Sequence, residues 1–299
     1  RLLTTADCST PRVCLRFSDF PTFLRSVTER IHVRLNQATH LPKGVIVMSN
    51  YAEANTTAAW YQDNFPGAVL DPKRGVLHTT EGTSLPGYNE GATAPHYTAV
   101  PNFKANRLDW FAHFPDERSA RALRNESGGV ETNTEDALQV ELVGTCSPAN
   151  RDAWRKKGAQ FIYWPDAPVW ALWDVADFIA DINVRHGIPA KSPLTWRPYP
   201  ASYGANGVRM RGENWVKFEG WCGHQHVPEN SHGDPGDIPW SDIERLAKGI
   251  LAKPKPTPNW DKLFEQARDL KRGLPGDARS RIKDLDRIQE IAARWSSKH

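Results

Sequence analysis

The segment GHQHVPENSHGDPG, residues 223–236, holds three histidines, one aspartate, two prolines and three glycines. Imidazole nitrogen and carboxylate oxygen are zinc ligands, and a catalytic zinc site keeps three protein ligands and one open position. His224 and Asp234 are ten residues apart, and the proline and the glycine between them, Pro228 and Gly233, permit the tight reversal that would bring both side chains together. The segment predicts either two metal ligands or a polar loop that is rich in histidine.

A third ligand has to come from elsewhere in the chain, and His78 is the best placed. It ends the apolar stretch GVLH and is followed by the polar turn TTEG. The end of a strand is a rigid platform for a ligand, although a single histidine there can equally be a hydrogen-bonded core residue. His226, two residues after His224, could compete for the metal, because alternate residues of a strand share a face.

Three stretches must supply the strands that position these side chains. RGVLHTT, APHYTAV and DALQVELVG, residues 74–80, 94–100 and 136–144, are rich in Val, Leu, Tyr and Thr and are bounded by Gly, Pro or Asn. Glu141 lies in the last of them, where a strand carboxylate either faces solvent or takes part in chemistry.

Two helices are predicted to follow the strands. Apolar residues recur at helical spacing over residues 169–187, and Gly187 supplies a C-terminal stop. A second helix is predicted to open at Ser241, whose spacing from Glu244 is that of a capping box. Strands mixed with helices predict an α/β fold with a mixed central β-sheet flanked by helices.

The two ends of the chain have sequence patterns that differ from the alternating strand and helix patterns of its centre. Residues 1–57 are predicted to form an N-terminal helical segment, and residues 58–252 the α/β domain. The alternating prolines of KPKPTP, residues 253–258, predict an extended linker. Residues 259–299 show two amphipathic helical patterns broken by GLPGD, which predicts a helical C-terminal hairpin that docks on the domain or on a partner.

Composition narrows the classes of partner. A net charge of +3 and a pI near 8.6, without clustered Lys and Arg, exclude a nucleic-acid footprint and suit a mildly anionic partner such as a cell wall. No run approaches the roughly 18 apolar residues of a membrane span, and RLLTTADCSTPR lacks the apolar core of a signal peptide. We therefore expect neither export nor a membrane anchor.

The four cysteines form no CxxC pair and are too few for a disulfide scaffold of this size. Reduced thiols are the expected state. A bridge between Cys8 and Cys14, or between Cys146 and Cys222, is the alternative.

The ordered motifs resemble those of a known enzyme family. HTTEG at 78–82, TNTEDALQVELVG at 132–144 and the segment 223–236 look like the zinc-dependent N-acetylmuramoyl-L-alanine amidases of the type 2 amidase and peptidoglycan-recognition-protein family. ARALRNESGGVETN at 120–133 and RHGIPAKSPLTW at 185–196 resemble the amidase modules of endolysins from phages of actinobacteria. The resemblance covers roughly residues 58 to 252.

The resemblance implies a role for individual residues. The family's zinc ligands fall on His78, His224 and Asp234, and its catalytic glutamate falls on Glu141. A further catalytic position, often lysine in the family, is His232 here. Since a histidine can be neutral at the working pH, its role departs from that of lysine.

Two other positions are interpreted differently. A tyrosine that joins the site elsewhere in the family falls on Pro95, and the adjacent Tyr97 is predicted to point to the other face of its strand. The family counterpart of His226 is not usually a ligand, so His226 is assigned to loop support.

The implied function is hydrolysis of the amide bond between N-acetylmuramic acid and the L-alanine of the stem peptide. Peptidoglycan would be the partner, with no nucleic acid and no membrane, and an endolysin would stay in the host cytoplasm before its release to the wall. Two alternatives stay open: a zinc peptidase that cuts within the stem peptide, and a non-catalytic peptidoglycan-binding module. The sequence makes no prediction of the oligomeric state.

Overall fold

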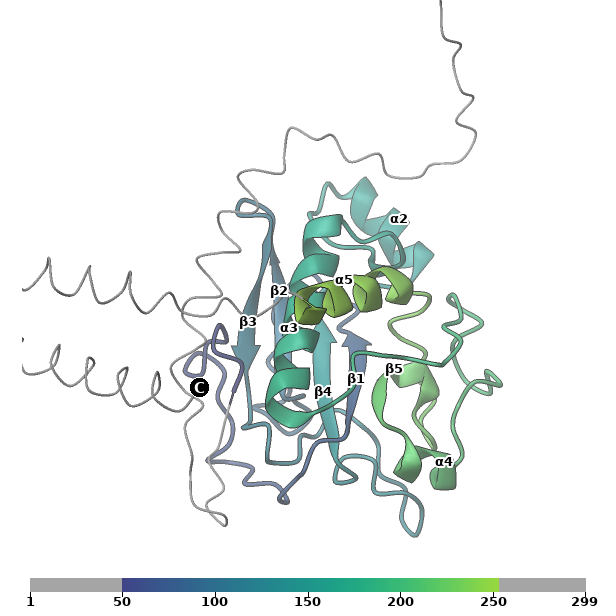
Figure 1. Ribbon diagram of the computed structural model, residues 1–299. Helices are drawn as coiled ribbons and strands as arrows, with labels where there is room; N and C mark the ends of the chain where they lie inside the picture. Colours follow the sequence, from purple (N-terminus) through teal and green to yellow (C-terminus); the bar gives the residue numbers. More distant parts are fainter. Residues whose placement is uncertain (1–49, 253–299) are drawn as a thin grey trace, which may run out of the picture.

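The computed structural model describes residues 50–252, and a five-stranded sheet lies at the centre of this part of the chain (Figure 1). The strands are β1 (Arg74–Thr79), β2 (Tyr97–Asn102), β3 (Arg107–Ala112), β4 (Ala137–Leu142) and β5 (Gly220–Gly223). Their order in the sheet is β3-β2-β4-β1-β5. All neighbouring pairs are parallel except β2 and β3, which are antiparallel. The predicted mixed sheet is confirmed.

Helices flank the sheet, as predicted. They are α2 (Pro148–Lys156), α3 (Val169–His186), α4 (Gly212–Lys217) and α5 (Trp240–Ala252), with short 3₁₀ turns η3 (Trp164–Asp166) and η4 (His224–His226). α3 and α5 pack on each other in front of the sheet, while α2 lies beyond the carboxyl ends of β1 and β4 (Figure 1).

The ends of α3 and α5 test the predicted stop and start signals. α3 ends before Gly187, whose φ of 75° lies in the left-handed region that favours glycine, so the predicted stop is confirmed. The capping-box prediction is wrong, because α5 already begins at Trp240 and Ser241 lies inside it. Glu244 instead accepts hydrogen bonds from the Trp240 indole N–H and the Ser192 backbone N–H.

The two faces of the sheet carry different side chains. Leu77, Val140 and Tyr97 belong to the large apolar cluster that also contains Phe178 of α3, and Tyr97 therefore points away from the metal-ligand candidates as predicted. His78 pairs with Glu141 across β1 and β4, and Thr98 pairs with Glu141 across β2 and β4. Because side chains alternate along a strand, this row of polar groups occupies the face opposite α3.

Several predictions fall outside the described residues. These are residues 1–49 of the predicted N-terminal helical segment, the linker at 253–258, the C-terminal hairpin at 259–299, and Cys8 with Cys14. Cys146 and Cys222 are described, and both are buried free thiols, so no bridge joins them. Within residues 50–252 no helix is both long and apolar enough to cross a membrane.

Candidate metal centre

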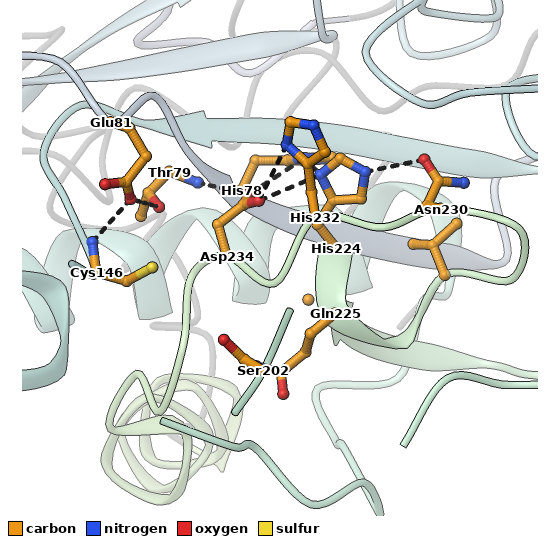
Figure 2. A network of polar contacts seen from close by, with 12 residues as sticks. His78, Thr79, Glu81, Cys146, Ser202, His224, Gln225, Asn230, His232 and Asp234 are labelled. Carbon is orange, nitrogen blue, oxygen red and sulfur yellow. Dashed lines mark hydrogen bonds and ion pairs between the residues drawn. The ribbon is translucent and has the colours of Figure 1, made fainter. Parts of the chain in front are cut away.

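Three predicted ligands converge at the carboxyl end of the central strands (Figure 2). His78 lies near the end of β1, His224 directly follows β5, and Asp234 lies in the loop that leads to α5. All three side chains are buried. The His78 Nδ1 atom is 3.0 Å from His224 Nδ1 and 3.6 Å from Asp234 Oδ2, and His224 Nδ1 is 3.3 Å from Asp234 Oδ1.

Asn230 fixes the tautomer of His224. The Asn230 Oδ1 atom accepts a hydrogen bond from the Arg124 backbone N–H at 3.0 Å, which identifies it as the oxygen of the amide. The same oxygen lies 3.0 Å from His224 Nε2, so this nitrogen must carry the proton and donate it. The lone pair of neutral His224 is therefore on Nδ1 and points toward His78 and Asp234, as a metal ligand requires.

The electrostatics favour an ionised Asp234 carboxylate beside a neutral His78 ring. Burial, followed by the neighbouring His224, lowers the pKa of His78 to about 3. Burial alone would raise the pKa of Asp234, but His224, His78 and the Thr79 backbone N–H, which donates to Oδ2 at 3.0 Å, hold it well below its usual range. Metal binding needs these protonation states, because only unprotonated ligands offer lone pairs.

The donor atoms also fit the geometry of a zinc ion. Ligand atoms about 2.0–2.1 Å from a tetrahedral centre are separated by about 3.3 Å. The three separations found here, 3.0, 3.3 and 3.6 Å, bracket that value. Two imidazole nitrogens with one carboxylate oxygen are ligands typical of zinc rather than of calcium or magnesium.

Two glycines of the motif are required by close approach. A Cβ atom added at Gly223 would lie 2.7 Å from the Trp196 ring and 2.8 Å from Pro235. A Cβ atom at Gly233 would lie 2.3 to 2.6 Å from Tyr203 and Ser202. The residues preceding His224 and Asp234 therefore have to be glycine for the two ligands to meet.

Glu141 points to the same face as His78, which is its partner on the neighbouring strand. Its Oε2 atom is buried without a hydrogen-bond partner among the described residues. Burial, then the charges of Asp234 and Glu81, raise the pKa of this carboxyl well above its usual range. A carboxyl group whose pKa is raised binds a proton more readily than an exposed glutamate does, as an acid–base group requires.

His232 lies at the rim of the centre. Its side chain is 67% exposed, its Nδ1 is 3.9 Å from Asp234 Oδ1, and its ring stacks on that of His224 with the centroids 5.0 Å apart. Burial of part of the ring and the neighbouring His224 lower its pKa. His232 can therefore offer a neutral N–H to a group bound beside Asp234.

The other histidines of residues 50–252 make their hydrogen bonds away from the candidate metal centre. His226 accepts a hydrogen bond from the Gly223 N–H at Nδ1 and donates to the Thr195 carbonyl from Nε2, so neither nitrogen is offered to a metal. His96 bonds to backbone at both nitrogens, and His186 contacts the buried Asp116.

The polar segment 120–133 holds its own loop together. Asn133 Oδ1 accepts from the Leu123 N–H, and Asn125 Oδ1 accepts from the Asn133 N–H. Arg121 lies over the Phe65 ring. Most of these groups bond to one another or to backbone and so act as cross-links of the loop.

Two supporting residues of the centre were not predicted from the sequence. Arg209 donates to the carbonyls of Gly204, His224, Val227 and His232, and so holds both sides of the ligand loop. Glu81 accepts hydrogen bonds from the Thr79 hydroxyl and the Cys146 backbone N–H, both at 2.8 Å. An arginine or a glutamate in a polar loop gives no sequence signal of such a role.

Comparisons with known proteins give weak matches. No family model and no curated protein matches the chain. Among solved structures, a mutant of PlyL is similar, with 13% identity, a TM-score of 0.32 and coverage of 60% of this chain and 87% of that one. AmpDH3 from Pseudomonas aeruginosa is 17% identical, with a TM-score of 0.35 and coverage of 78% and 77%. Its complex with anhydromuramic pentapeptide gives 14% identity, a TM-score of 0.32, and 78% and 83%.

Proposed function

We propose that the chain is a zinc-dependent N-acetylmuramoyl-L-alanine amidase that degrades peptidoglycan, as the endolysin of an actinobacterial phage would. The observation that carries the proposal is the convergence of the donor atoms of His78, His224 and Asp234 within 3.0 to 3.6 Å. Glu141, the strand partner of His78, supplies the acid–base group that hydrolysis needs. The identity of the substrate is inferred from the resemblance of the sequence motifs to those of the amidase family.

The residues divide the reaction between them. His78, His224 and Asp234 would hold the zinc ion, which when bound would supply Lewis acidity and lower the pKa of water to about 7. Glu141 accepts a proton from the attacking water and returns it to the nitrogen of L-alanine as the lactyl–alanine amide bond breaks. His232 donates a hydrogen bond to the oxyanion as it forms, an interaction that can contribute a few kcal/mol.

Substitution of the ligands and of the acid–base group should separate their roles. His78→Ala, His224→Ala and Asp234→Ala should each abolish hydrolysis of purified peptidoglycan and lower the zinc content. Glu141→Gln should keep the zinc but reduce kcat by at least about 100-fold, because only proton transfer is lost. Zinc is measured by mass spectrometry of the metal, and hydrolysis by the release of peptides. Full activity in any ligand variant would overturn the proposed site.

The products distinguish the proposed reaction from the two alternatives. An amidase releases stem peptides with a free N-terminal L-alanine and leaves the glycan strands intact. A zinc peptidase would instead cut a bond inside the stem, and a binding module would retain peptidoglycan without releasing any product. Mass spectrometry of the digested wall identifies which of these occurs.

A further inference from the structure

A chain of hydrogen bonds runs across the sheet face beside Glu141. The Tyr88 hydroxyl lies 2.6 Å from Thr98 Oγ1, and this oxygen lies 2.8 Å from His113 Nε2. His113 Nδ1 in turn lies 2.7 Å from the Ala59 backbone carbonyl oxygen. Thr98 and His113 are buried, whereas Tyr88 is half-buried.

The Ala59 carbonyl, at the buried end of this hydrogen-bond chain, determines which group donates in each of its bonds. A carbonyl oxygen only accepts, so His113 must carry its proton on Nδ1. Burial lowers the pKa of His113 to about 4, so the ring is neutral at pH 7 and its Nε2 can only accept. The Thr98 hydroxyl therefore donates to His113, and the Tyr88 hydroxyl has to donate to Thr98. The Tyr88 oxygen is left with its lone pairs as an acceptor.

The position of the Tyr88 oxygen relates it to the candidate site. Thr98, which holds it, is the strand partner of Glu141 on β4, and Glu141 is in turn the partner of His78 on β1. Burial, followed by the charge of Glu141, raises the pKa of Tyr88, so the phenol stays protonated and can donate to Thr98. Among residues 50–252 the Tyr88 oxygen has no hydrogen-bond partner other than Thr98.

The loop around Tyr88 is built to hold this position. Tyr88, Asn89 and Glu90 all have φ between 50° and 58°, in the left-handed region. Residues other than glycine rarely adopt this conformation, so the surrounding contacts must stabilise it. Thr93 and Gly91 both donate backbone hydrogen bonds to the Tyr88 carbonyl, and the Tyr88 ring packs edge-on against His113 at 5.2 Å.

We propose that Tyr88 is a substrate-binding residue of this site, whose oxygen accepts a hydrogen bond from an N–H or O–H group of the substrate beside Glu141. Thr98 and His113 act as positioning residues, because they force the phenol to present an acceptor rather than a donor. The inference rests on the proposed function for the identity of the substrate, but the direction of the chain does not depend on it.

Substitutions along the hydrogen-bond chain test the substrate-binding role of Tyr88 against a matched control. Tyr88→Phe should lower kcat/KM for a soluble muramoyl peptide at least tenfold while the zinc content and the melting temperature stay the same. Thr98→Val should cause a smaller loss in the same direction, and Thr98→Ser, which keeps the hydroxyl, should restore activity. Tyr61→Phe removes the hydroxyl of a second ring that stacks on His113; this hydroxyl donates to the Gly87 carbonyl at 3.3 Å and does not belong to the Tyr88–Thr98–His113 chain, so kcat/KM should stay unchanged. Equal kcat/KM values for Tyr88→Phe and Tyr61→Phe would overturn the proposal.

The tautomer of His113 gives a readout that does not involve activity. Long-range ¹H–¹⁵N spectra of the folded wild-type protein at pH 7 should show the proton on Nδ1 and an unprotonated Nε2. A proton on Nε2 would reverse the chain and overturn the proposal even if the amidase is active. If the wild-type protein leaves the muramoyl–alanine amide intact, the proposed function fails, and the spectra still decide whether Tyr88 presents an acceptor.

Discussion

At the scale of single residues, the candidate centre depends on groups that never touch a metal. Asn230 bonds to His224 Nε2 and, through its other contacts, to the carbonyls of Arg124 and Pro228. Its amide therefore sets both the tautomer and the ring orientation of His224. Partners of this kind typically change metal affinity by 10- to 100-fold when removed.

We predict that Asn230→Ala weakens zinc binding by about 10- to 100-fold, because His224 loses the acceptor that keeps its proton on Nε2. Asn230→Asp retains an acceptor oxygen at the same place and should lose less affinity than the alanine variant. Calorimetric titration of the metal-free proteins with zinc measures both. Wild-type affinity in Asn230→Ala would show that the ligand loop orients His224 without this contact.

The sequence predicts the ligands of the candidate centre but not the residues that orient them. His78, His224 and Asp234 could be proposed because imidazole and carboxylate have ligand chemistry of their own. Asn230 could not, because its role depends on the Arg124 backbone, 106 residues away in sequence, and on which amide atom that N–H selects. The acceptor role of Tyr88 likewise follows from a carbonyl at Ala59.

At the scale of elements, local sequence patterns predicted β1, β4 and α3, because the residues of these segments favour strand or helix conformation by themselves. β3 and β5 were not predicted. The sequence of β3, RLDWFA, mixes charged and aromatic residues, and β5 has only four residues, GWCG, of which two are glycine. Their strand conformation comes from pairing with β2 and β1, which is information about the sheet rather than about the segment.

The pairing of β1 with β5 makes a prediction about Gly75. Its strand partner is Trp221, and a Cβ atom at Gly75 would lie 2.4 Å from that buried ring. Gly75→Ala should therefore destabilise the fold by about 1–3 kcal/mol through overpacking. Urea denaturation measures the free energy of unfolding.

A glycine in α5 provides the matched control. Gly249 is exposed, and a Cβ atom added there would meet nothing within 4 Å, so Gly249→Ala should leave the fold unchanged or stabilise it by up to about 1 kcal/mol. Equal effects of the two substitutions would show that Trp221 can move aside and that its packing does not fix the β1–β5 pair.

At the scale of the whole molecule, three buried histidines outside the candidate metal centre make the fold dependent on pH. His96, His113 and His226 each donate from one nitrogen to a backbone carbonyl and accept at the other. At His96 and His226 the accepted group is a backbone N–H, which a second ring proton would oppose directly. Burial lowers the pKa of all three to about 4 from an ordinary value of 6.5.

The sign of the effect follows from these values. Between pH 6.5 and 4 these histidines are protonated in the unfolded chain but stay neutral in the folded protein. Their contribution to the free energy of unfolding is therefore fully present above pH 6.5 and is lost as the pH falls toward 4. Each histidine accounts for on the order of 3 kcal/mol by pH 4. Since a domain is stable by about 5–15 kcal/mol, we predict acid unfolding within this range. Urea denaturation at a series of pH values, with a chelator present, measures it.

One substitution distinguishes histidine protonation from general charge repulsion as the cause of acid unfolding. His96→Gln replaces a titrating ring by a neutral amide and could lower stability at every pH, but it removes one of the three proton-linked contributions. The fall in unfolding free energy between about pH 7.5 and pH 4 should therefore shrink by about 3 kcal/mol relative to the wild-type protein. If the two curves stay parallel, the acid sensitivity arises from other groups, and the neutral state of His96 is not what links the fold to pH.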